Sequence, residues 1–184
     1  MVHMTESTWR ILPLAAEHTY RLAECHIACW REAYADLVPA HVLAAFDVRR
    51  RAAQWERDRL RYPGRTHVAV LGDAVIGFAS AGESTDESPV TALELSALYV
   101  RAAWYGTGVA DDLLRTVLDP RKPCSLWVFE DNPRARAFYG RHGFRPDGAR
   151  KIEPFTAVLE LRMVRPPDET DLGATPSGPA VATR

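Results

Sequence analysis

The spacing of hydrophobic residues along this chain starts as a short strand-like run and continues as two long helical patterns. Residues 8–14 predict a strand, and residues 15–34 carry apolar side chains at helical spacing. The apolar stripe of this helix consists of Leu22, Cys25, Cys29 and Ala33. A second helical pattern extends from His41 to about Leu60, and Asp47 is placed to cap its second half if the helix breaks there.

The hydrophobic period then shortens, which predicts three successive strands. Apolar runs at 66–72 and 74–82 are joined by Gly72-Asp73, a sequence typical of a β-hairpin. Residues 91–100, "TALELSALYV", predict the third strand. Strict alternation would place Leu93, Leu95, Ala97 and Tyr99 on one face of this strand and Glu94, Ser96, Leu98 and Val100 on the other.

The rest of the chain predicts two more helices and three more strands. A helical pattern covers about 108–118, and a short helix in 131–144 has Asn132 as its cap and Gly143 as its stop. The predicted strands lie at 124–130, 144–151 and 155–163. This order of elements predicts an α/β (α+β) fold, with a mixed sheet and helices on both faces, rather than an alternating doubly wound sheet.

The length of 184 residues suits a single domain with a full hydrophobic core, which we place at 8–164. Residues 1–7 are expected to be disordered, either a cloning remnant or an alternative start around the second Met. Residues 165–184 are rich in Pro, Gly and Thr and poor in large apolar residues, so we expect a disordered C-terminal tail.

Composition excludes several classes of function. A formal net charge of −1 gives no reason to expect nucleic acid or a membrane surface as partner. No apolar run suits a membrane-spanning helix and no signal peptide is recognisable, so a cytoplasmic enzyme is the default. The 3 cysteines are too few for a disulfide framework and lack a zinc-binding set, so we predict no metal site and buried packing roles for them.

The segment "YGTGVA" at 105–110 has the features of an anion-binding turn. Gly106 and Gly108 allow close approach to the main chain, and the helix that follows contributes uncapped N–H groups and the positive end of its dipole. Such a turn can hold a pyrophosphate, although a turn that merely starts a helix would use the same glycines. No Lys-Ser or Lys-Thr follows and a third glycine is missing, so neither a Walker loop nor a dinucleotide site fits.

Two segments together resemble the GNAT superfamily of N-acetyltransferases. The first is "LYV" at 98–100, followed by five residues and then "GTGVA" at 106–110. The second is "LWVFEDNPRARAFYGRHGF", which carries Asn132, Ala135, Phe138-Tyr139 and Gly143-Phe144 at the family's spacing. The resemblance covers roughly residues 8 to 163. Tyr105 and Thr107 depart from it, because relatives usually have Gln or Arg at the first position and often a basic residue at the second.

The resemblance implies a twisted, mostly antiparallel sheet of about seven strands in which two parallel strands splay apart to form an acyl-CoA cleft. A bulge near 98–100 would leave main-chain groups free for acetyl-CoA, and the N–H of Val100 or Tyr99 would polarise the thioester carbonyl. Asp111 and Asp112 are expected to point away from the phosphates. The residues implied in cofactor binding are Leu98, Tyr99, Val100, Tyr105, Gly106, Thr107, Gly108, Val109, Ala110, Asn132, Ala135, Phe138 and Tyr139.

The reaction implied is attack of an amine on the thioester, which needs a base for the amine and a proton donor for the thiolate. Tyr139 matches the family's proton donor, with core packing as the alternative. Glu94 is the candidate base and Glu83 the second choice, with a solvated surface role or a water chain as alternatives. Trp30 and Tyr34 are predicted to border the acceptor pocket, where core packing would explain them equally well.

The sequence therefore predicts an N-acetyltransferase that transfers an acetyl group from acetyl-CoA to a primary amine of a small molecule. A protein lysine or N-terminal amine is the second choice of acceptor. A CoA-binding regulatory module without turnover is the alternative of a different class, and an α/β scaffold without CoA is disfavoured by the paired motifs. An exposed sheet edge is compatible with a homodimer.

Overall fold

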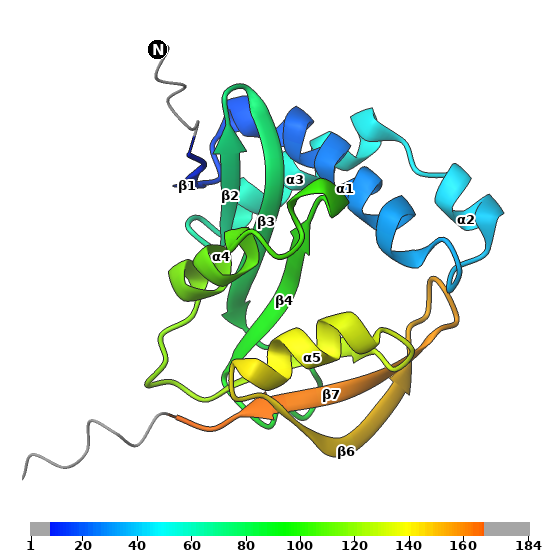
Figure 1. Cartoon of the computed structure of the whole chain (residues 1–184), viewed down its shortest axis with the longest axis vertical. Coiled ribbons are helices and arrows are strands. Elements are labelled where there is room, and N and C mark those ends of the chain that lie inside the picture. Colours follow the sequence, from blue (N-terminus) through cyan, green and yellow to red (C-terminus); the bar gives the residue numbers. More distant parts are fainter. Residues whose placement is uncertain (1–7, 168–184) are drawn as a thin grey trace, which may run out of the picture.

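The computed structural model describes residues 8–167, and its central feature is a seven-stranded mixed sheet with the order β1-β2-β3-β4-β5-β7-β6 (Figure 1). The strands are β1 (Arg10–Pro13), β2 (Thr66–Leu71), β3 (Ala74–Glu83), β4 (Leu93–Val100), β5 (Cys124–Phe129), β6 (Arg145–Ile152) and β7 (Leu159–Arg165). Only the β4–β5 pair is parallel within the described sheet. The predicted α+β class with a mostly antiparallel sheet is confirmed. The disorder predicted for 1–7, and the part of the 165–184 prediction beyond residue 167, lie outside the described residues, whereas Arg165 is the last residue of β7 and does not belong to a tail.

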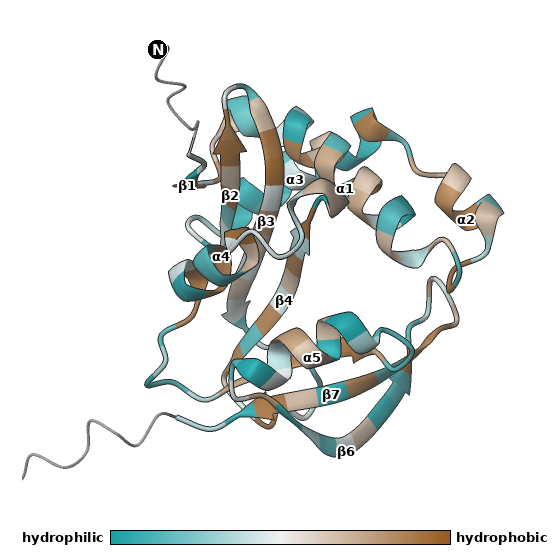
Figure 2. Ribbon diagram, viewed as in Figure 1, coloured by the Kyte–Doolittle hydropathy of each residue, from teal (hydrophilic) through white to brown (hydrophobic). Residues whose placement is uncertain are grey.

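Helices cover both faces of the sheet (Figure 1). They are η1 (Ala16–His18), α1 (Thr19–Tyr34), α2 (Ala40–Ala44), α3 (Val48–Arg61), η2 (Ala102–Trp104), α4 (Val109–Val117) and α5 (Pro133–Arg141). On one face, α1 and α3 pack with Phe78 of β3; on the other, α4 and α5 pack with Leu95, Leu126 and Leu161. The apolar positions of the central strands are therefore enclosed between helices whose outer surfaces are polar (Figure 2). No helix in the described part of the chain is long and apolar enough to cross a membrane.

Local sequence explains most of the element boundaries. The Asp47 carboxylate accepts a 2.7 Å hydrogen bond from the Arg50 N–H, so the second helical pattern breaks there as expected and α3 begins at Val48. The closing strand begins at Leu159 rather than Phe155, which corrects the predicted start. The cause is a turn in which the Glu153 carboxylate accepts hydrogen bonds from the N–H and hydroxyl of Thr156, at 2.6 and 2.8 Å.

A β-bulge at Ser96 changes which residues of β4 share a face. The pairing with β3 steps from Ser80↔Ala97 to Ala81↔Leu95, so Ser96 is an extra residue in β4. The bulge therefore lies at Ser96 and not at 98–100, and the strict alternation predicted for 93–100 is wrong. The face toward α4 and α5 carries Leu93, Leu95, Leu98 and Val100, whereas Ala97 and Tyr99 pack toward α1 and α3. Glu94, which precedes Leu95, is thereby placed on the α1 side with Tyr99.

The two parallel strands separate almost as soon as they meet. The β4–β5 ladder contains only the pairs Leu93↔Cys124 and Glu94↔Ser125. Beyond them β4 remains paired with β3 and β5 remains paired with β7, while a gap opens between β4 and β5. The predicted splayed strands are thus present, and the edge of β4 after residue 95 faces this gap.

Candidate functional site

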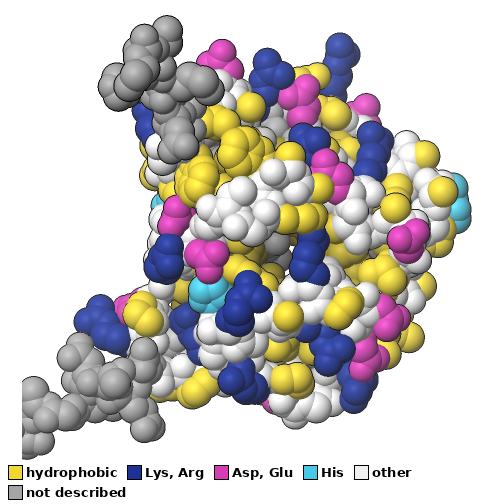
Figure 3. Space-filling model, in the orientation of Figure 1, with side chains coloured by type: hydrophobic (Ala, Val, Ile, Leu, Met, Phe, Trp, Pro, Cys, Tyr) yellow, Lys and Arg dark blue, Asp and Glu magenta, His cyan; other side chains and the backbone are white. Residues whose placement is uncertain are grey.

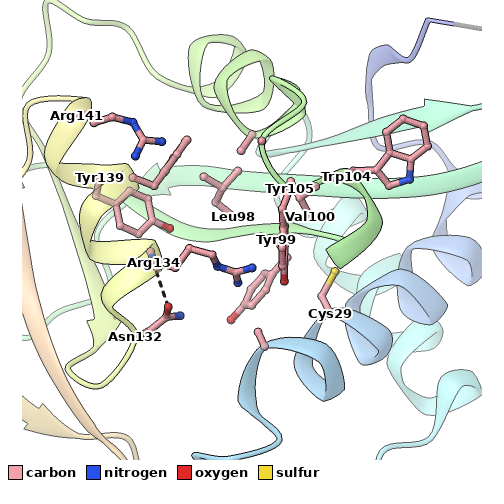
Figure 4. A pocket seen from close by; sticks show the side chains of 15 residues that line it. Cys29, Leu98, Tyr99, Val100, Trp104, Tyr105, Asn132, Arg134, Tyr139 and Arg141 are labelled. Atoms are coloured by element: carbon pink, nitrogen blue, oxygen red, sulfur yellow. Dashed lines mark hydrogen bonds between the residues drawn. The ribbon is translucent and has the colours of Figure 1, made fainter. Parts of the chain in front are cut away.

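A cleft opens where β4 and β5 diverge, between the turn before α4 and the helix α5 (Figure 4). Figure 3 shows the corresponding hollow in the middle of this face of the molecule, with basic side chains beside it. Of the residues predicted for cofactor binding, the cleft is lined by Leu98, Tyr99, Val100, Tyr105, Gly106, Ala110, Asn132, Ala135, Phe138 and Tyr139. Segments from 98 to 110 and from 132 to 139 thus converge on one cavity.

The glycine turn presents main-chain amides to the cleft. Gly106 and Gly108 have φ angles of 74° and 98°, a left-handed backbone that glycine adopts without strain. A Cβ on Gly106 would meet nothing within 4 Å, so the space in front of this residue is open. No side chain caps α4, whose N-cap residue is Gly108, so the first N–H groups of the helix keep their capacity to bind an anion.

Three predicted members of the turn do not line the cleft with their side chains. Val109 is fully buried in the core under α4. The Thr107 hydroxyl donates a 2.8 Å hydrogen bond to the Trp104 carbonyl, and Gly108 has no side chain. Any role of these residues toward a ligand is therefore restricted to the main chain.

The two acidic residues at the start of α4 point away from the turn, as expected. The Asp112 carboxylate accepts a 2.9 Å hydrogen bond from the Trp9 indole and pairs with Arg115. Asp111 lies 2.9 Å from His142 at the end of α5. Both carboxylates are thereby held by partners outside the glycine turn and leave its amides available to an anion.

Glu32 fixes the segment that leads into the turn, a contact that the sequence analysis did not identify. Its carboxylate accepts hydrogen bonds from the Ala102 N–H at 2.7 Å and from the Arg101 guanidinium at 2.9 Å. Burial opposes ionisation of this carboxyl, but the two hydrogen bonds outweigh burial and lower the pKa of Glu32. The helix α1 is thus tied to the turn by an ionised carboxylate.

Positive charge reaches the cleft from α5 rather than from the turn. Arg134 and Arg141 both line the cleft, and neither was predicted as a site residue. The Arg134 guanidinium lies 3.6 Å from the centre of the Tyr105 ring, so it spans the cleft toward the turn (Figure 4). The segment "NPRARAFYGR" could have indicated these two arginines, because a helix that begins at Asn132 and turns one face to the cleft also brings its arginine side chains there.

The free edge of β4 offers its own main-chain groups. The Arg101 N–H donates to the Ile76 carbonyl at 2.9 Å, which makes 101 a hydrogen-bonded position of the β3–β4 ladder. Because such positions alternate in an antiparallel pair, Tyr99 also bonds to β3 and Leu98 and Val100 direct their N–H groups into the gap. Val100 and Tyr99 were the two predicted donors to the thioester carbonyl. The N–H of Tyr99 is used by β3, whereas the N–H groups of Val100 and Leu98 are free to bind a ligand.

Tyr139 projects its hydroxyl from α5 into the cleft (Figure 4). The side chain is buried against Phe144, and its hydroxyl has no hydrogen-bond partner among residues 8–167. Burial, followed by the neighbouring Tyr34 and Cys124, raises the pKa of Tyr139 above its ordinary value. The phenol is therefore protonated at neutral pH and has a proton to donate.

The predicted acidic residues lie at the other end of β4. Glu94 is buried and accepts a 2.7 Å hydrogen bond from the Ser84 hydroxyl, at the point where β4 and β5 begin to separate. Glu83 is exposed at the end of β3 and lines neither the cleft nor the cavity under α3 described below.

Glu160 of β7 is a further acidic residue on the same side of the sheet. Its neighbour Leu161 packs under α5, so Glu160 faces the opposite side, where Glu94 and Tyr34 are among its electrostatic neighbours. Burial raises the pKa of Glu160, Lys151 partly offsets this effect, and Glu153 and Glu94 add to it. Its alternation with Leu159 and Leu161 was visible in the sequence, but its proximity to Glu94 depends on the sheet order.

The aromatic residues predicted for the acceptor side form a cluster next to the gap. Trp30 and Tyr34 of α1 contact each other, Tyr99 and Phe129, with ring centroids 4.7–6.4 Å apart. They therefore pack between α1 and the two strands, β4 and β5, that border the gap. All three cysteines are buried, as predicted, and Cys29 of α1 also lies at the wall of the cleft.

Comparison with known proteins relates this chain to N-acetyltransferases. Residues 20–144 match the family described as the acetyltransferase (GNAT) family. An N-acetyltransferase of Mycobacterium bovis, itself described as uncharacterized, is 28% identical over 120 residues, which are 62% of this chain and 74% of the relative. A relative from Mycobacterium tuberculosis matches over the same shares.

Solved structures share the fold at low sequence identity. The PaiA N-acetyltransferase of Thermoplasma acidophilum, in complex with coenzyme A, superimposes with a TM-score of 0.61 at 17% identity, over 84% of this chain and 98% of that one. YncA of Salmonella typhimurium, a putative acetyltransferase with its cofactor acetyl-CoA, gives a TM-score of 0.63 at 16% identity, over 89% and 96%.

The Glu32 contact generates a prediction about stability and pH. Because the pKa of Glu32 is lowered in the folded state, its contribution is present above its unfolded pKa of about 4.3 and is lost as the pH falls through the folded value. We expect Glu32→Gln to lower the free energy of unfolding by about 1 kcal/mol at pH 7, with the deficit shrinking toward pH 3. Denaturant titrations across pH measure this.

The control is Glu24→Gln, on the same helix. Its carboxylate pairs with Arg21, and both side chains are exposed, so the change is expected to stay within about 0.5 kcal/mol. An equal effect of the two substitutions, or a Glu32→Gln deficit independent of pH, would contradict the role given to Glu32.

Proposed function

Because this chain belongs to the GNAT family, and is thus an N-acetyltransferase, we propose that it transfers an acetyl group from acetyl-CoA to a primary amine of a small molecule. The observation that carries the proposal is the convergence of uncapped turn amides, the free edge of β4 and the Tyr139 hydroxyl on one cleft. When bound, acetyl-CoA supplies an activated acyl group on a thioester.

The residues present fit the phosphates of this cofactor. The space before Gly106 is open, the amides at the start of α4 are uncapped, and the two acidic side chains there are held by Trp9 and His142. Arg134 and Arg141 supply the positive charge that Tyr105 and Thr107 do not. The free N–H and C=O groups of Leu98 and Val100 suit the amides of a pantetheine arm, which can pair with them as an added strand does.

Protein groups are available for each proton and charge that the reaction moves. The Val100 or Leu98 N–H would donate to a developing oxyanion. Tyr139 would donate its proton to the departing sulfur, and its raised pKa keeps that proton in place beforehand. Glu94 and Glu160, on the acceptor side of the splay, would take the proton of the incoming ammonium group directly or through water.

One feature favours a small molecule over a protein as the acceptor. A second feature favours catalysis over a purely regulatory role. Trp30, Tyr34 and Phe129 place aromatic rings on the acceptor side, where they suit contact with a small cationic amine. An unpartnered Tyr139 hydroxyl on one side of the gap and two acidic residues on the other provide the groups that turnover needs and that simple CoA binding does not.

Binding of acetyl-CoA is the first test of this proposal. We expect acetyl-CoA to raise the melting temperature of the wild-type protein, as a ligand of the native state must. Arg134→Ala should weaken binding about tenfold in calorimetry, because it removes a charged group from the cleft. Arg136→Ala is the matched control on the same helix, since Arg136 bonds the Glu130 carbonyl and does not line the cleft. Absence of any complex with the wild type would overturn the proposal.

Removal of the Tyr139 hydroxyl tests the proton donor. Tyr139→Phe keeps the packing against Phe144 and is expected to lower kcat about 100-fold, with the affinity for acetyl-CoA unchanged. Thiol release monitored with a reactive amine measures kcat, and calorimetry measures the affinity. Tyr20→Phe, an exposed tyrosine on α1 that does not line the cleft, serves as the control for the loss of a phenol hydroxyl. A Tyr139→Phe rate equal to that of the wild type would remove this residue from the chemistry.

The pH dependence of the rate distinguishes the two candidate bases. A base must be ionised to act, so kcat/KM should fall as the pH is lowered through its pKa, and for Glu160 that pKa lies above the ordinary carboxyl value. We expect the acid limb of the pH–rate profile to disappear in Glu94→Gln or in Glu160→Gln, whichever residue acts. Profiles that keep the wild-type limb in both variants would show that neither carboxylate is the base.

A further inference from the structure

A second cavity lies on the other face of the sheet, under α3. Its lining includes Trp30 of α1, Arg51, Trp55 and Asp58 of α3, and Tyr99 of β4. Tyr99 also lines the cleft described above, so the two cavities meet at this side chain. The cavity under α3 is therefore placed to hold an acceptor whose amine reaches the splay from the α1 side.

Arg51 is a cation in this cavity without a counterion. Its side chain is half-buried, its guanidinium donates a 3.2 Å hydrogen bond to the neutral Gln54 amide, and no carboxylate forms an ion pair with it among residues 8–167. Burial lowers the pKa of Arg51. A partly desolvated guanidinium is costly unless it is paired, so this wall of the cavity is electrostatically incomplete without an anion.

The neighbouring groups do not neutralise Arg51. Asp58, seven residues further along α3, attracts the charge of Arg51 but forms no ion pair with it, and Arg65 adds a second positive charge to the lining. His26 contributes no charge at neutral pH, because burial and then the nearby Arg51 lower its pKa to about 3. The cavity therefore has a positive end at Arg51.

The remaining lining is aromatic and has unused hydrogen-bond capacity. The indole N–H of Trp55 and the Nδ1 of His26 are buried and have no partner among the described residues. Both rings line the cavity beside Arg51 and Tyr99. Rigid aromatic walls with a few polar atoms are typical of pockets for small organic ligands.

We propose that the acceptor carries a carboxylate that pairs with Arg51 in the cavity under α3, so that the substrate class is an amino acid acetylated on its amine. The inference rests on the proposed function and narrows its substrate. A planar guanidinium matches the two oxygens of a carboxylate. With the carboxylate held at α3, the amine would extend past Tyr99 toward the splay and the acidic pair Glu94 and Glu160.

Kinetics with matched acceptors test this inference. Thiol release from acetyl-CoA is measured for a panel of amino acids, each against its amide and its decarboxylated amine. In the wild type, kcat/KM for at least one amino acid should exceed that of its two neutral partners by at least about tenfold. Arg51→Ala should remove that preference and leave the rate with the decarboxylated amine within about twofold. Arg50→Ala, its exposed neighbour on α3, should behave as the wild type.

The outcomes separate this inference from the proposed function. Turnover in which no amino acid exceeds its amide or decarboxylated amine would overturn the carboxylate site while the acetyltransferase activity stands. A preference for an amino acid that persists in Arg51→Ala would overturn the assignment to Arg51. Binding gives a readout independent of turnover: titration of the preferred acceptor's N-acetylated product should give at least about tenfold weaker affinity in Arg51→Ala than in the wild type. Equal affinities would also overturn the assignment.

Discussion

The structure depends above all on the early separation of β4 from β5. Two pairs of residues hold the strands together, and beyond them each strand keeps only its other neighbour. Main-chain groups of β4 are then left at a strand edge inside the molecule, where they need a partner. A ligand that runs between the strands would satisfy them, so the absence of a β4–β5 ladder at 95–100 is itself the basis of the proposed site.

The rest of the fold brings chemistry to this gap from two sides. The turn at 105–110 and the helix α5 meet on one face, with uncapped amides, two arginines and the Tyr139 hydroxyl. The acidic and aromatic residues lie on the other face, because the bulge at Ser96 turns Tyr99 toward α1 and the order of strands brings β7 beside β5. The acetyl donor and the amine acceptor of the proposed reaction can therefore approach the same stretch of β4 from opposite sides of the sheet.

Local patterns in the sequence were sufficient for most of the elements and for most of the residues that line the cleft. The glycines of the turn, the cap at Asn132 and the hairpin at Gly72-Asp73 act over a few residues, and each was predictable. The extra residue Ser96 was not, because a bulge shows only against the partner strand. The hydrogen bonds of Glu32 and the proximity of Glu160 to Glu94 involve segments far apart in the chain, so no local pattern carries them. The basic side chains of the cleft, Arg134 and Arg141, lie on α5 and were not identified from the sequence.

Amide hydrogen exchange, measured with and without acetyl-CoA, tests the central claim most directly. Leu98 and Val100 should exchange much more slowly in the complex, together with the amides of 106–110. Tyr99, already at a hydrogen-bonded position of the β3–β4 ladder, should change far less. Slowing of Tyr99 to the same extent as its neighbours, or exchange rates at all these positions that ignore the cofactor, would contradict the account.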